Sequence, residues 1–126
     1  MNLHDEALAA AGVIGSGVAV VHGVLTQRLM VAPFERLADG RLAKPIRRLV
    51  PALLHFSTFN WFFGGLALIV AAVASGPEAK LATAVLVGSS YLVAALGNLW
   101  GTRGRHLGWA LYAIALALIV FGVTGA

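Results

Sequence analysis

Four long segments without a charged residue dominate this sequence. They cover residues 7–27, 49–77, 81–102 and 106–126, which are 21, 29, 22 and 21 residues long. An α-helix rises about 1.5 Å per residue, so about 20 residues cross the roughly 30 Å hydrocarbon core of a bilayer. Each segment is therefore long enough to form one transmembrane helix.

The composition supports a membrane protein. Charged residues make up 11% of the chain and hydrophobic residues 60%, whereas a soluble domain has about 25% charged residues. A membrane barrel is not expected, because the apolar segments lack the alternation of apolar and polar residues that barrel strands show. We predict an all-α bundle of four transmembrane helices in a single domain, residues 1–126, with spans near 7–27, 49–75, 81–101 and 106–124.

The basic residues predict the orientation in the membrane. Eight of the nine lie between the first and second or the third and fourth segments: Arg28, Arg36, Arg41, Lys44, Arg47, Arg48, Arg103 and Arg105. Basic residues in short loops favour the cytoplasmic side, so both termini should face outward from a bacterial inner membrane. The same residues can contact anionic lipid headgroups. The net charge of +4 is thereby explained without a nucleic-acid partner.

The first basic segment carries signals for a short helix at the membrane surface. Pro33 is suited to a first helical turn and Gly40 to a helix end. A second proline, Pro77, precedes Glu78, and this pair is typical of a helix start. We expect an interfacial helix before Gly40 and the beginning of the third long helix near Pro77.

Small residues form stripes along three of the expected helices and predict how the helices pack. Helices in lipid associate through small residues and interhelical hydrogen bonds. The stripes are Gly12, Gly15, Ala19 and Gly23 in the first helix, Ala84, Gly88, Tyr91, Ala95 and Asn98 in the third, and Ala110, Ala113 and Ala117 in the fourth.

Two further faces carry small or polar residues, and they suggest a contact outside the bundle. They are Ser57, Asn60 and Gly64 in the second helix and Thr83, Ser90, Ala94 and Gly97 in the third. A lipid-facing Asn is unfavourable. We therefore expect the protein to contact a second copy of itself or another subunit.

His22 and His55 are the strongest candidates for functional residues. Each lies about six residues from the cytoplasmic end of its segment, and an ionisable group inside a span is a functional candidate. Other polar residues are expected near them: Thr26, Thr58, Asn98, His106 and Tyr112. Three roles stay open for the two histidines: hydrogen bonding that fixes helix packing, axial ligation of haem b or binding of a pigment, and proton or lipid-headgroup binding.

The haem interpretation uses several further residues. The small stripe at Gly15, Ala19 and Gly23 would let a flat macrocycle approach, and nearby arginines such as Arg28, Arg47 or Arg48 would neutralise its propionates. Packing alone explains the same histidines, so neither interpretation is excluded.

Enzymatic templates are not fulfilled. The four segments contain no Asp or Glu and the chain contains no Cys, which removes paired carboxylates and thiolates from the membrane interior. No catalytic residue and no metal site is predicted, and we do not expect an enzyme.

Two stretches carry a resemblance. HGVLTQR at residues 22–28 and HFSTFNW at residues 55–61 resemble a pattern in small bacterial four-helix inner-membrane proteins, in which one His precedes a basic loop and a second precedes Ser or Thr and then Trp. The resemblance covers about half the chain and implies the fold and the membrane, but no activity.

Three functions are compatible with these observations. The first is an accessory or scaffold subunit of a homo- or hetero-oligomeric membrane complex. The alternative is an electron-transfer protein that holds haem b, or a pigment, through His22 and His55. The third is a small transporter or lipid-binding protein with a cavity on the cytoplasmic side.

Overall fold

The computed structural model describes residues 1–124 as helices joined by short turns, with no strand in that range. The all-helical class is confirmed, and the last two residues of the expected domain lie outside the described part. The elements are α1 (Leu3–Thr26), the π-helical turn η1 (Gln27–Val31), α2 (Ala32–Ala38), α3 (Lys44–Ala74), α4 (Pro77–Thr102) and α5 (Gly108–Thr124).

Three continuous helices are long and apolar enough to cross a membrane: residues Leu3–Ala38, α3 and α4. The fourth apolar helix, α5, has 17 residues, or about 25 Å at the helical rise. These lengths agree with a membrane protein.

The first helix is longer than the sequence predicted. Asn2 caps its start, because the Asn2 side chain accepts from the Asp5 N–H and the Asp5 carboxylate accepts from the Asn2 N–H. The helix then continues through η1 into α2, so the expected interfacial helix exists but no loop separates it from α1. Pro33 has no N–H to donate to Leu29, and the wider π turn before Pro33 accommodates this interruption.

Residues with special backbone conformations mark several helix ends. Gly40 has a φ of 70° and follows α2, as predicted. Pro77 starts α4, which confirms the second proline prediction. Arg103 and Gly104 both have positive φ at the end of α4, and the Gly104 N–H donates to the Leu99 carbonyl over 2.9 Å.

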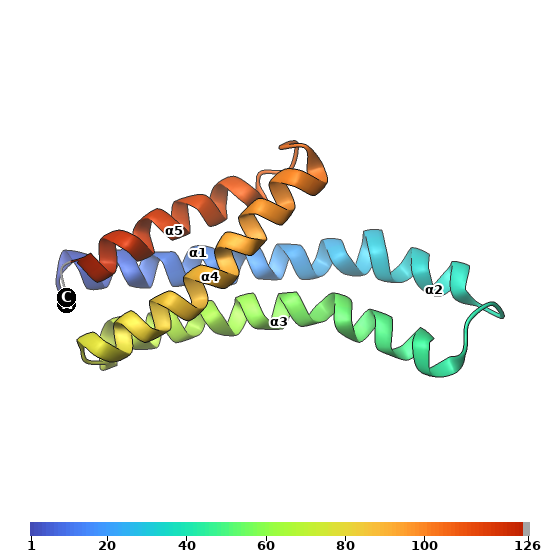
Figure 1. Ribbon diagram of the computed structural model, residues 1–126, viewed down its shortest axis with the longest axis horizontal. Coiled ribbons are helices and arrows are strands. Elements are labelled where there is room, and N and C mark those ends of the chain that lie inside the picture. Colours follow the sequence, from blue (N-terminus) through green and yellow to red (C-terminus); the bar gives the residue numbers. More distant parts are fainter. Residues whose placement is uncertain (125–126) are drawn as a thin grey trace.

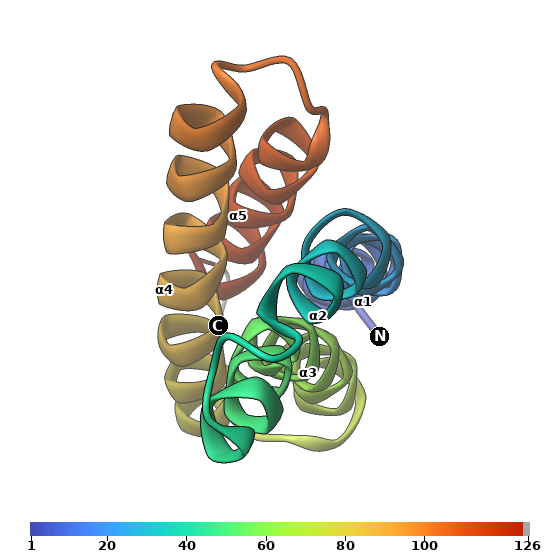
Figure 2. The ribbon, with the colours of Figure 1, turned by 90° about the vertical axis from the view of Figure 1, so that its right-hand side faces the viewer.

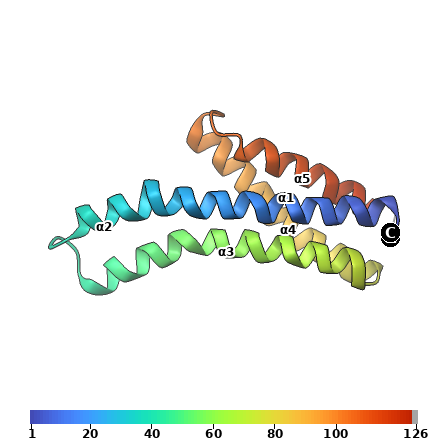
Figure 3. The ribbon, with the colours of Figure 1, turned by 180° about the vertical axis from the view of Figure 1, so that it is seen from behind.

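The helices form two hairpins that cross obliquely. α1 and α3 run side by side, and the hairpin of α4 and α5 lies diagonally over them (Figure 1). The view from behind shows that α1 and α3 stay together along their length, up to the turn after α2 (Figure 3). In the end-on view α5 lies between α4 and α1 (Figure 2), so α1 contacts both α3 and α5.

Small residues form the centre of this packing, as predicted for α1 and α4. Gly12 lies against Gly65, and a Cβ at Gly65 would be 2.5 Å from the Gly12 carbonyl oxygen. The predicted face of α4 is buried at Ala84, Gly88, Tyr91 and Ala95.

The predicted packing face of the fourth helix is wrong. Ala113 and Ala117 are exposed and Ala110 is only partly buried, whereas α5 buries Tyr112, Ala115, Ile119 and Gly122. The large side chains of Tyr112 and Ile119 fill space between the two hairpins. The face of α5 that carries them is therefore the buried face.

The two faces expected to be surplus meet each other. Asn60 on α3 donates through Nδ2 to Ser90 Oγ on α4 over 2.6 Å, and Gly64 faces Val87 on α4. The Asn60 amide therefore has a partner within the chain, but Asn60 itself is exposed. The expected contact with a second copy or another subunit stays a prediction. Gly97 is exposed with no neighbouring atom within 4 Å of a Cβ position.

Candidate functional site

A cavity lies where α5 diverges from α1. α5 meets α1 near the two chain ends and leaves it toward the turn after α4 (Figure 1). The cavity has a volume of about 410 Å³, which is within the range of small-molecule sites. We call it the α1–α5 cavity, and it is lined by Val13, Ile14, Gly17, Val18, Val21, His22, Asn98, His106, Leu107, Gly108, Leu111 and Tyr112.

His22 is the polar residue that α1 contributes to this cavity. Its Nε2 lies 3.2 Å from Ser57 Oγ and 3.2 Å from Thr26 Oγ1. Its ring packs against the Trp61 ring in a T-shaped arrangement, with a centroid distance of 4.6 Å. Since Thr26 is buried, these contacts hold the imidazole between α1 and α3 with one side toward the cavity.

His55 lies apart from this arrangement. Its Nε2 is 2.9 Å from Gln27 Oε1, so it joins α3 to the first residue of η1 and does not line the cavity. The two histidines therefore occupy different hydrogen-bond networks. Both histidines hydrogen-bond between helices, which agrees with the packing role.

The haem interpretation is not supported by the space around α1. A Cβ at Gly15 would overlap the Tyr91 phenol, and a Cβ at Gly23 would lie 2.8 Å from Thr58 Cγ2. Ala19 is completely buried. Protein side chains thus fill the surface along which a macrocycle would have to approach.

Tyr112 lines the cavity from α5 and has an unusual hydroxyl. The residue is 0% exposed, and its hydroxyl has no hydrogen-bond partner among residues 1–124. Its ring packs against Trp61 and Tyr91 at centroid distances of 5.3 and 4.8 Å. Tyr91 differs, because its hydroxyl donates to the Trp61 carbonyl over 3.2 Å. A buried polar group without a partner is unfavourable and marks a candidate ligand contact.

Asn98 and His106 form the polar end of the cavity near the turn between α4 and α5. The Gly108 N–H donates to His106 Nδ1 over 3.1 Å. Asn98 Nδ2 donates to the Ala94 carbonyl over 2.9 Å, which leaves Oδ1 available as an acceptor. Both side chains are partly buried.

The structure thus brings together four residues of the predicted polar cluster: His22, Asn98, His106 and Tyr112. Thr26 supports His22 from the next turn. Thr58 is elsewhere: its buried hydroxyl has no partner within residues 1–124 and its methyl group packs on Gly23.

Sequence reasoning missed the apolar half of the cavity. Val13, Gly17 and Val21 recur every four residues and therefore form one face of α1, with Leu107 and Leu111 opposite. The spacing was visible in the sequence, but the divergence of α5 that leaves this face uncovered was not.

The eight basic residues expected on the cytoplasmic side occupy two regions. Arg103 and Arg105 are exposed in the turn after α4, and the other six lie along η1, α2, the turn after α2 and the start of α3. Arg47 pairs with Asp39 at 2.9 Å. A polar cavity of about 490 Å³ lies beside this pair and is lined by Glu35, Lys44, Arg47 and Arg48.

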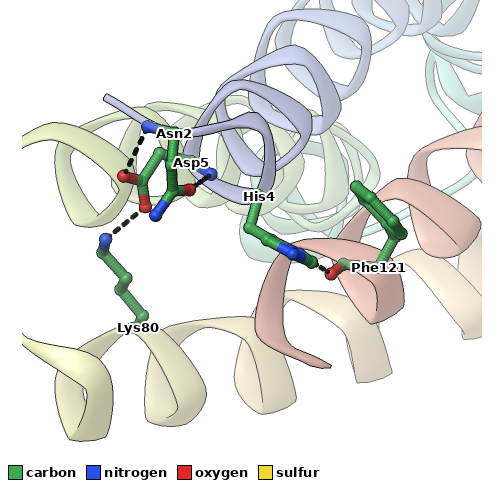
Figure 4. A network of polar contacts seen from close by, with 5 residues as sticks. All are labelled: Asn2, His4, Asp5, Lys80 and Phe121. Carbon is green, nitrogen blue, oxygen red and sulfur yellow. Dashed lines mark hydrogen bonds and ion pairs between the residues drawn. The ribbon is translucent and has the colours of Figure 1, made fainter. Parts of the chain in front are cut away.

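The opposite end of the molecule holds a polar network that the sequence did not indicate. Asp5 accepts from Lys80 at the start of α4, and His4 Nδ1 lies 2.8 Å from the Phe121 carbonyl oxygen of α5 (Figure 4). The His4 and Phe121 rings stack at 4.6 Å. The first turn of α1 is thereby tied to both helices of the second hairpin.

Comparison with protein-family models, curated proteins and solved structures finds no match for this chain.

Proposed function

We propose that this chain is a four-span protein of a bacterial inner membrane that binds a lipophilic molecule in the α1–α5 cavity. The observation that carries the proposal is the lining of the cavity, which combines an apolar wall with a small polar end. Such a combination is typical of small-molecule sites. This is the third of the functions compatible with the sequence.

The position of the cavity supports entry from the bilayer. Val13, Gly17 and Val21 on α1 and Leu111 on α5 are exposed at its mouth. In a membrane these side chains face lipid, so a lipophilic molecule can enter sideways between α1 and α5. His22 and His106 lie inside, where they would meet the polar end of that molecule.

A photoreactive long-chain alcohol tests the proposal in nanodiscs. We expect crosslinks at 13–22 and 106–112, because both stretches line the cavity. Gly17→Phe should abolish these crosslinks by filling the mouth, since no atom lies within 4 Å of a Cβ at Gly17.

Gly97→Phe is the matched control. Gly97 is also exposed and free of neighbours within 4 Å of a Cβ, but it does not line the cavity. This variant should keep the crosslinks. Labelling spread evenly over the lipid-facing surface and unchanged by Gly17→Phe would contradict ligand binding in the cavity.

One observation favours the accessory-subunit role as a second candidate. Phe56, Phe59 and Phe63 form a row along α3 and are 70%, 62% and 57% exposed. Aromatic side chains are enriched in protein interfaces. If this row covers another subunit, native mass spectrometry from nanodiscs will show the chain in a larger complex, whereas a single monomer-sized species will count against it.

A further inference from the structure

The charges around the α1–α5 cavity restrict which molecules it can hold. None of its lining residues is Lys, Arg, Asp or Glu. A carboxylate or ammonium group placed there would lose its hydration without gaining an ionic partner, which is strongly unfavourable. The cavity therefore favours a neutral ligand.

The polar end presents two hydrogen-bond donors. Because His106 Nδ1 accepts from the Gly108 N–H, the proton of the neutral ring is on Nε2, which is then a donor. The Tyr112 hydroxyl is the second donor; it is fully buried and has no acceptor among residues 1–124. A ligand oxygen that displaces the packing over this hydroxyl would accept from both donors.

An acceptor lies beside these donors. Asn98 uses its amide N–H₂ on the Ala94 carbonyl, so its Oδ1 is available to a hydroxyl. The cavity can thus hydrogen-bond a carbonyl oxygen through Tyr112 and His106 and a hydroxyl group through Asn98. Toward the mouth, Val13 and Gly17 on α1 and Leu111 on α5 offer only apolar contact.

We propose that the ligand is a neutral quinone- or quinol-type molecule. A quinone oxygen would accept from Tyr112 and His106, a quinol hydroxyl would also donate to Asn98 Oδ1, and the apolar tail would leave between α1 and α5. This inference rests on the proposed function and specifies the ligand class. The volume of about 410 Å³ suits a substituted ring with the first part of a tail, while the rest of the tail lies in the bilayer.

Competition against the photoreactive alcohol tests the ligand class. Three competitors share a ten-carbon chain: a decyl-substituted benzoquinone, decylbenzene and decanoate. We expect the quinone to displace the label at a concentration about tenfold lower than decylbenzene, because only the quinone has an acceptor for the two donors. Decanoate should be the weakest, since its charge has no partner.

Two isosteric variants separate hydrogen bonding from packing. Tyr112→Phe should weaken competition by the quinone about fivefold and leave competition by decylbenzene unchanged. Tyr91→Phe is the control, because its hydroxyl already bonds the Trp61 carbonyl and does not line the cavity. Tyr91→Phe should leave competition by the quinone and by decylbenzene unchanged.

The outcomes distinguish the two proposals. If the label maps to the cavity but the quinone competes no better than decylbenzene, or decanoate competes best, the ligand class is wrong while the cavity still binds lipophilic molecules. If the label does not map to the cavity at all, the proposed function fails and this inference fails with it.

Discussion

Two charged side chains, Asp5 and Lys80, join the first turns of α1 and α4. Both side chains are 16% exposed, so water screens this pair less than a pair on an open surface. Asp5 precedes the first charge-free segment and also caps α1. The hydrogen bond from Lys80 and the backbone hydrogen bond at Asn2 hold the pKa of the Asp5 carboxyl below its ordinary value of 3.8.

We expect Asp5→Asn to lower the thermal unfolding midpoint of the protein in nanodiscs at pH 7. The lowered pKa means that the carboxylate stabilises the folded state above the ordinary pKa, and this contribution is lost as the pH falls through the folded value. The difference between wild type and Asp5→Asn should therefore narrow under strongly acidic conditions. A pH series of unfolding midpoints measures it.

Asp39→Asn is the control for Asp5→Asn. Asp39 pairs with Arg47, but its side chain is 76% exposed, and exposed ion pairs contribute little. This variant should unfold close to wild type at every pH. An equal loss from both substitutions would show that the Asp5 pair has no special role.

The contact between α1 and α3 depends on the close approach of their backbones at Gly12 and Gly65. A Cβ at Gly12 would overlap the Gly65 carbonyl and lie 2.7 Å from Ile69 Cγ1. Because Gly65 contributes backbone here, rotation of a side chain cannot relieve the overlap. The helices would have to separate, and the contacts between them would weaken along the hairpin.

Gly12→Ala should therefore destabilise the protein by about 1–3 kcal/mol, the usual effect of overpacking. Unfolding in SDS mixed micelles measures the change. Gly17→Ala, in the same helix, is the matched control, because a Cβ there has no neighbour within 4 Å and alanine has the higher helix propensity. Gly17→Ala should cause no loss, and equal stability of the two variants would contradict this account of the hairpin.

The whole molecule has the start of α1, the end of α5 and the α3–α4 turn at one end and eight of its nine basic residues toward the other (Figure 1). The residues Leu3–Ala38 and α3 have 36 and 31 residues, or about 54 and 46 Å, which exceeds the hydrocarbon thickness. The excess length of both helices, together with the turn that joins them, carries six of the nine basic residues. We infer that this end of the first hairpin extends into the cytoplasm.

Single cysteines test that orientation directly, because the chain has none of its own. We expect a membrane-impermeant maleimide added to intact spheroplasts to label Gly76→Cys between α3 and α4, and to label Leu42→Cys only after the membrane is opened. Both positions lie in exposed turns. The reverse pattern would contradict the outward position of the termini, and labelling of both in intact spheroplasts would contradict a four-span topology.

Local features of the sequence were sufficient for the helices and several of their ends. The charge-free segments and the prolines are local signals that need no tertiary contact. The cap at Asn2 is also local, but it was not predicted, and the first helix was expected to start at residue 7. The inward face of α4 around Tyr91 was also predictable, since helical periodicity alone places residues on one side. Pro33 was the ambiguous signal, because a π turn lets a helix continue where a loop was expected.

Periodicity alone could not identify which helix each face meets. The inward side of α1 was apparent from its small residues, but the oblique crossing of the two hairpins placed Tyr91 over Gly15 and joined Asn60 to Ser90. The same crossing separated His55 from the cavity and left the hydroxyl of Tyr112 without a partner. The apolar helices and their polar interior residues follow from local sequence patterns. Which of those residues share a cavity depends on helix packing, because the angle between packed helices depends on the shapes of both surfaces.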